Sequence, residues 1–145
     1  MTNEERPDKL DAIYPVGEKQ PERVRTRHGR PLTDLTLDNL LAGHTTASDF
    51  GITAEGLRLQ AEIAEQARRP NLAQNLRRGA ELVEIPDDVL LETYELLRPG
   101  RAQSADDLQA AADRLRRTYG AEETARLIEE AATVYERRGI FDRRI

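Results

Sequence analysis

Two histidines have the widest catalytic repertoire of any residues in this chain, yet neither lies in a pattern that supports catalysis. His28 and His44 each lack a second histidine or a carboxylate at helical spacing, which a metal site on one helix would need. We interpret both as solvated loop histidines. The alternative is that one of them is a metal ligand or a general base.

A short basic run is the strongest local charge feature. It consists of Arg23, Arg25, Arg27, His28 and Arg30. In an extended segment the first three arginines would share one side, as a phosphate-binding strip requires. Glu18 and Glu22 dilute the run, and it contains no Phe or Trp on which bases could stack. We interpret the run as a solvated or partner-facing arm rather than a nucleic-acid-binding strip.

Paired acidic residues are the remaining candidates for chemistry. They are Asp87–Asp88, Glu122–Glu123 and Glu129–Glu130. Adjacent side chains diverge on a helix, so a pair of this kind does not converge on one proton. The first two pairs fit the preference of helix N-termini for acids. Glycine-rich phosphate loops and the nucleophile elbow of serine hydrolases are also absent. We therefore predict no catalytic, cofactor-binding or metal-binding residue on this chain.

Charge and composition narrow the function classes further. The 145 residues carry a net charge of −5 and include no cysteine. The acidic balance argues against a general nucleic-acid binder, and the lack of cysteine excludes disulfides and thiolate ligands. No window approaches the ~18 apolar residues of a membrane span, and the polar start does not resemble a signal peptide. We expect a cytoplasmic protein that binds neither nucleic acid nor membranes.

The periodicity of apolar residues predicts an all-α domain. Aromatic residues make up only 4% of the chain, which favours helices over a β-sandwich. We expect five principal helices at about 53–68, 71–83, 86–98, 104–119 and 121–138, and a shorter one from Thr36 to Gly43. Thr53 should cap the first, Pro70 should end it, and Ser104 with Asp107 resembles a capping box. Gly120 should terminate the helix that this box opens.

The N-terminal segment differs in composition from the helical part. Residues 1–32 hold four of the seven prolines and few apolar anchors, so they cannot bury enough surface to fold alone. We predict a partly disordered and then extended arm over 1–32, followed by a helical domain over 33–145. The arm should lie on a partner from about Tyr14. The candidate partner-binding residues are Tyr14, Pro15, Val24, Arg58 and Arg98.

An ordered set of short motifs resembles a known family. The motifs run from Tyr14-Pro15 through Leu35-Thr36-Leu37-Asp38-Asn39, Leu57-Arg58-Leu59-Gln60-Ala61, residues 75–82, Pro86-Asp87-Asp88 and Tyr94-Glu95-Leu96-Leu97-Arg98-Pro99 to Glu130-Ala131-Ala132 and Tyr135-Glu136-Arg137-Arg138. In this order and spacing, they resemble the small subunit of adenosylcobalamin-dependent diol and glycerol dehydratases. The resemblance covers most of the chain, from about Tyr14 to Gly139.

The resemblance implies a role in a larger enzyme. Such lyases contain large, medium and small subunits, assembled as a dimer of heterotrimers, that is, a heterohexamer. The large subunit carries the radical chemistry that converts propane-1,2-diol or glycerol to an aldehyde. Adenosylcobalamin lies between the large and medium subunits, and the small subunit packs on the large one without a known catalytic group. The chain begins shortly before Tyr14, so we do not expect the N-terminal extension that is associated with microcompartments.

Two other functions remain open from the residues alone. A free-standing helical interaction module or regulator would be a monomer or homodimer without a large-subunit partner. A nucleic-acid-binding helical protein would use the arm from Arg23 to Arg30 and would show salt-sensitive DNA binding. An enzyme that acts alone is the weakest alternative, because residues to perform the chemistry are lacking.

Overall fold

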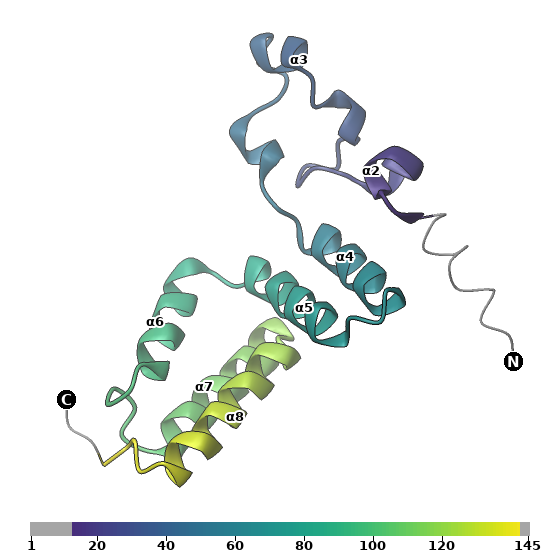
Figure 1. Cartoon of the computed structure of the whole chain (residues 1–145). Helices are drawn as coiled ribbons and strands as arrows, with labels where there is room; N and C mark the ends of the chain where they lie inside the picture. Colours follow the sequence, from purple (N-terminus) through teal and green to yellow (C-terminus); the bar gives the residue numbers. More distant parts are fainter. Residues whose placement is uncertain (1–12, 143–145) are drawn as a thin grey trace, which may run out of the picture. The chain divides into compact units, whose positions relative to one another are not determined.

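A computed structural model describes residues 13–142 of the chain (Figure 1). The predicted all-α class is confirmed: within these residues the secondary structure is helical, apart from an isolated antiparallel bridge between Arg25 and Pro31. The long helices are α4 (Ala54–Gln66), α5 (Pro70–Glu84), α6 (Asp87–Leu97), α7 (Ala105–Tyr119) and α8 (Glu122–Arg137). The chain divides into two compact units, residues 1–80 and 81–145.

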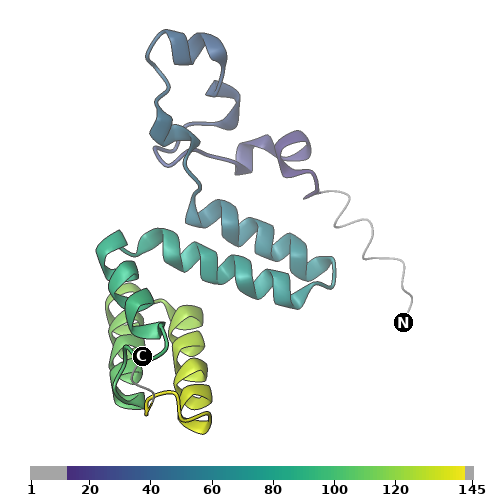
Figure 2. The same cartoon turned by 60° about the vertical axis from the view of Figure 1, so that its left-hand side comes forward.

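The N-terminal unit is built around α4 and the first part of α5, which lie side by side (Figures 1 and 2). Thr53 caps α4 as predicted, since its side chain accepts a hydrogen bond from the Gly56 N–H. Small residues form the contact between the two helices: Ala61 and Ala64 of α4 are buried with Ala73 of α5. Alanines allow the helix axes to approach closely, and this explains the compact pair.

The connection between α4 and α5 differs from the prediction. Pro70 was expected to end the first helix, but it is the first residue of α5, and α4 already ends at Gln66. Proline suits the first helical position because its fixed φ is helical and its missing N–H would have no intrahelical partner there. Arg68, in the short link, has a φ of 58°, and this left-handed residue reverses the chain.

Short helical turns precede α4 in the same unit. They are α2 (Val16–Lys19), the 3-10 helix η1 (Pro21–Arg23), the 3-10 helix η2 (Leu32–Asp34), α3 (Leu37–Leu41) and the 3-10 helix η3 (Ala47–Phe50). The part of the predicted arm that the structure describes is therefore not extended throughout. Val16 is buried against Leu59 and Ile63 of α4, with Val24 packed beside them. The first twelve residues of the predicted arm lie outside the described part.

The C-terminal unit has its own hydrophobic core. Leu108 and Leu115 of α7 and Ile128 of α8 are its largest fully buried side chains. Helices α7 and α8 form a hairpin, and the predicted stop at Gly120 is confirmed by its φ of 65°. The predicted capping box of α7 is also present, with Asp107 accepting from the Ser104 N–H. Tyr135 of α8 donates to the Leu97 carbonyl at 2.5 Å and so ties α8 to the end of α6.

The N-terminus of α8 is capped from another helix. Its own N-cap residue, Ala121, has no side chain that could accept a hydrogen bond. Glu81 supplies the acceptor: its carboxylate binds the Glu123 N–H at 2.9 Å, and the Thr124 N–H and hydroxyl each at 2.7 Å. This carboxylate satisfies N–H groups that have no intrahelical partner and carries the charge that a helix N-terminus favours.

Candidate partner-binding surface

The structure gives three of the predicted binding residues different environments. Tyr14 is 55% exposed and lines a hollow with residues of α4 and α5, including Ile63 and Leu72. Pro15 is exposed at the start of α2. Val24 is half-buried against the chain's own core. Tyr14 and Pro15 are thus accessible to another molecule, whereas part of the Val24 side chain is already covered.

The two predicted arginines are both exposed and both engaged. Arg98 follows α6 and forms an ion pair with Glu95 at 2.9 Å, and Arg101 binds the same carboxylate group at 2.9 Å. Arg58 lies on α4 and also interacts with another residue. Exposed ion pairs contribute little to stability, so Arg98 can exchange its partner at low cost. The role of both arginines in binding stays a prediction.

The basic run does not form a strip along one side. Arg23 pairs with Glu62 of α4 at 3.5 Å, and Arg25 donates to the Gly29 carbonyl at 3.0 Å. Arg30 pairs with Asp34 at 3.6 Å and also donates to the His44 carbonyl and the Thr45 hydroxyl. The chain bends within the run, because Thr26 accepts the Gly29 N–H and binds the Arg30 carbonyl through its backbone. Each of these arginines therefore has its own local partner.

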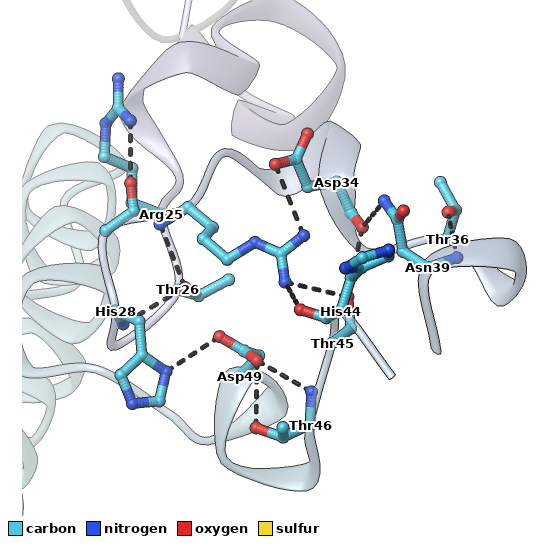
Figure 3. Close-up of polar contacts among 12 residues, drawn as sticks. Arg25, Thr26, His28, Asp34, Thr36, Asn39, His44, Thr45, Thr46 and Asp49 are labelled. Carbon is cyan, nitrogen blue, oxygen red and sulfur yellow. Dashed lines mark hydrogen bonds and ion pairs between the residues drawn. The ribbon is translucent and has the colours of Figure 1, made fainter. Parts of the chain in front are cut away.

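His28 was interpreted as a solvated loop histidine, and the structure shows a specific contact. Its ring Nδ1 lies 3.0 Å from a carboxylate oxygen of Asp49, 21 residues along the chain (Figure 3). The other oxygen of Asp49 accepts the Thr46 N–H at 2.9 Å and the Thr46 hydroxyl at 3.1 Å. The Asp49 side chain is only 4% exposed. This contact closes a compact lobe over residues 24–53, which we call the 24–53 lobe.

The electrostatics of the 24–53 lobe follow from these bonds. Hydrogen bonds from the Thr46 backbone and then from His28 hold the pKa of Asp49 well below its ordinary value, because they stabilise the charged form. A second set of bonds fixes the other end of the lobe. The Asn39 side chain donates to the Asp34 carbonyl at 2.8 Å, and Thr36 caps α3 by accepting from the Asn39 N–H (Figure 3). The lobe is therefore organised by polar contacts rather than by a core.

The His28–Asp49 pair resembles part of a catalytic triad but lacks the rest. The hydroxyl of Thr26 accepts the backbone N–H of His28 and makes no bond to its ring, so it is not placed as a nucleophile. Over residues 13–142, no cluster of three or more His, Asp or Glu side chains is arranged to hold a metal ion. The contact between His28 and Asp49 thus joins two distant parts of the 24–53 lobe.

An ion-pair cluster joins α7 to α8 in the C-terminal unit. Arg116 binds Glu122 at 2.8 Å and Glu129 at 2.9 Å, and these contacts raise its pKa far above the ordinary value. The pKa of Glu122 is lowered chiefly by its bond to Arg116. That of Glu129 is lowered first by Gln109 and then by Arg116. The cluster is partly exposed and joins the two helices of the hairpin, so we assign it a role in stabilising the hairpin.

Large apolar side chains remain uncovered in each unit. In the N-terminal unit they include Leu37, Leu41, Phe50 and Ile52, which are 57–78% exposed; in the C-terminal unit they include Leu91 and Tyr94, at 68% and 66%. Helix α3 buries no residue at all. Clusters of exposed apolar side chains are typical of surfaces that bind another protein. No helix within residues 13–142 has the length and apolar character needed to cross a membrane.

The described residues thus form a helical protein of two units, each of which exposes large apolar side chains. The family model of the dehydratase small subunit matches residues 10–142. A propanediol dehydratase small subunit from Citrobacter freundii is 48% identical over 122 residues, which cover 84% of this chain and 70% of the relative. Another propanediol dehydratase small subunit, from Salmonella typhimurium, is 47% identical over 122 residues, with the same coverage of both chains. The chain belongs to the dehydratase small-subunit family.

Proposed function

We propose that this chain is the non-catalytic small subunit of a propanediol dehydratase that uses adenosylcobalamin. The match to the family over residues 10–142, together with two relatives that are named for propanediol, is the observation that carries the proposal. The substrate class is a vicinal diol, which a hydro-lyase converts to an aldehyde and water. The relatives' names favour propane-1,2-diol over glycerol.

The chain's part in this enzyme is to pack on and support the large catalytic subunit. The assembly also contains a medium subunit and is a dimer of heterotrimers in the cytoplasm. Adenosylcobalamin supplies the radical chemistry when it is bound by the large and medium subunits, and this chain does not hold it. The exposed apolar side chains of both units support this role, because a partner that covers them removes apolar surface from water. Tyr14, Pro15, Val24, Arg58 and Arg98 remain candidates for the contact.

Co-expression tests the proposal directly. The full chain is produced with the large and medium subunits encoded beside it, the complex is purified by size exclusion, and aldehyde formation from propane-1,2-diol is measured with added adenosylcobalamin. We expect one complex that contains all three chains, and lower or less durable activity when this chain is omitted. Elution of this chain alone, with full activity of the other two subunits, would contradict the proposal. It would favour a free-standing interaction module.

A further inference from the structure

Arg27 differs from the other arginines of the basic run. Its guanidinium lies against the backbone of Gly51, with Nη2 3.8 Å and Cζ 3.9 Å from where a β-carbon on that glycine would be. Among the described residues, it forms no ion pair or hydrogen bond, whereas Arg23 and Arg30 pair with Glu62 and Asp34. The neighbours of Gly51 in sequence are both apolar and exposed, Phe50 at 57% and Ile52 at 59%. We call Arg27, Phe50, Gly51 and Ile52 the Arg27 patch.

The backbone that carries the Arg27 patch is held in place before any partner arrives. Thr26 and His28 flank Arg27. Thr26 is buried and accepts the backbone N–H groups of His28 and Arg30, while the ring of His28 contacts Asp49. Figure 3 shows the contact between His28 and Asp49. Since Asp49 directly precedes Phe50 in the sequence, this contact positions both halves of the patch. A surface that is already ordered loses less conformational entropy on binding.

A hollow adjoins the Arg27 patch and is lined mainly by apolar side chains. Its lining includes Val24, Leu32, Leu35 and Leu57, together with Phe50 and Ile52 from the patch. A hollow of this kind accepts an apolar side chain from a partner. An aromatic residue, an arginine and a neighbouring apolar recess are the composition that binding hot spots favour.

The positive charge of Arg27 determines which kind of partner fits the patch. A second copy of this chain, packed by two-fold symmetry, would place Arg27 patches against each other and bring like charges together. The carboxylate of Asp49, which directly precedes Phe50, is 4% exposed and already bonded to His28 and Thr46, and within the described part of the chain Arg27 has no ion pair. The complementary partner is therefore another chain, one that offers a carboxylate next to an apolar side chain.

We propose that the Arg27 patch docks on the large dehydratase subunit, which supplies an aspartate or glutamate for Arg27 and an apolar side chain for the adjoining hollow. This inference rests on the proposed function, since the family assigns the chain to a dehydratase with other subunits. The inference adds to the proposed function a surface of this chain and the chemistry of its contact. None of the five binding candidates from the sequence is part of the Arg27 patch.

Charge reversal tests the ion pair. The complete complex is co-expressed with Arg27→Glu, with Phe50→Ala, and with the control Arg137→Glu at an exposed position of α8, and circular dichroism confirms that each variant folds. We expect Arg27→Glu and Phe50→Ala to weaken binding of the chain to the large subunit by about tenfold or more, as hot-spot residues do, and the control to bind like the wild type. Wild-type affinity in both patch variants would overturn the inference and leave the proposed function intact.

Cross-linking identifies the partner without relying on lost affinity. The chain has no cysteine, so Ile52→Cys creates a unique thiol for a maleimide photo-cross-linker, and Arg137→Cys is the matched control. We expect the Ile52→Cys chain in the assembled complex to capture the large subunit, and peptide mapping to find an acidic residue near the captured site. Capture of the medium subunit or of a second copy of this chain would overturn the inference. Absence of any three-chain complex with the wild type would overturn the proposed function as well.

Discussion

At the residue scale, Asp49 is the group whose ionisation matters most to the 24–53 lobe. Its pKa is lowered in the folded chain, first by the Thr46 backbone and then by His28, so the charged form stabilises the fold above the ordinary carboxyl pKa of about 3.9. This contribution is lost as the pH falls below that value toward the lower folded pKa. We expect wild-type stability to decline over this acid range.

Replacement of Asp49 with Asn checks the assignment. The amide keeps the shape of the side chain but loses the charge, so Asp49→Asn should melt at a lower temperature than the wild type at pH 7. The difference should shrink as the pH is lowered below about 4. Thermal unfolding from pH 7 to pH 2.5 measures both effects. A constant difference over the whole range would mean that the charge of Asp49 does not stabilise the lobe.

Glu81 offers a second prediction at the same scale. Glu81→Ala leaves the N–H groups of Glu123 and Thr124 without their acceptor, which should lower the free energy of unfolding by about 1–3 kcal/mol. Urea denaturation measures the loss. The control is Glu130→Ala at an exposed position of α8, which should change the stability by no more than about 0.5 kcal/mol. Equal effects of the two substitutions would show that Glu81 does not act as a cap.

At the scale of the helices, two glycines should respond in opposite directions to alanine. Gly79 lies inside α5, where a β-carbon would meet Leu57 at an ordinary contact distance of 3.5 Å, so Gly79→Ala should raise the stability by up to about 1 kcal/mol. Gly120 has a φ of 65°, so Gly120→Ala should cost about 1–2 kcal/mol although nothing lies near the added carbon. Urea denaturation measures the midpoint of each variant. A midpoint above that of the wild type for Gly79→Ala and below it for Gly120→Ala would confirm the prediction, and shifts of both midpoints in the same direction would contradict it.

Several helix boundaries were predictable because their signals are local, although the end of α4 and the start of α5 were not. Thr53, the capping box at Ser104 and the stop at Gly120 each depend on a few neighbouring residues, and all three are confirmed. In the 24–53 lobe, the short helix capped by Thr36 is confirmed as α3. The contact between His28 and Asp49 was not predicted, because it joins residues far apart in the sequence. Nothing in the spacing of two polar residues 21 positions apart identifies such a pair.

The environments of the candidate binding residues could be predicted only in part, because some of them also depend on contacts between distant residues. Tyr14 and Pro15 stand out in the sequence and are exposed, but the half-burial of Val24 depends on how α2 packs on α4. The ion pair of Arg98 with Glu95 follows the three-residue spacing that brings side chains together on a helix. The unpaired state of Arg27 required knowing where every other acidic side chain of the described residues lies.

At the scale of the whole molecule, the two units have separate hydrophobic cores. The core of the C-terminal unit is formed by residues from Ile85 to Ala132, and the buried clusters of the N-terminal unit by residues from Val16 to Ala73. A cavity made in one core should therefore weaken the unit that contains it much more than the other. Leu108→Ala, at a fully buried position, should destabilise the C-terminal unit by about 2–5 kcal/mol.

Hydrogen exchange resolves this prediction because it reports stability region by region. In Leu108→Ala, we expect faster exchange in α7 and α8 and unchanged protection in α4. The reciprocal variant, Leu59→Ala in the N-terminal unit, should accelerate exchange in α4 and leave α7 unchanged. Uniform acceleration of all helices in both variants would show that the chain unfolds as one cooperative body. Separate responses would mean that a partner can order the surface of one unit without having to stabilise the other.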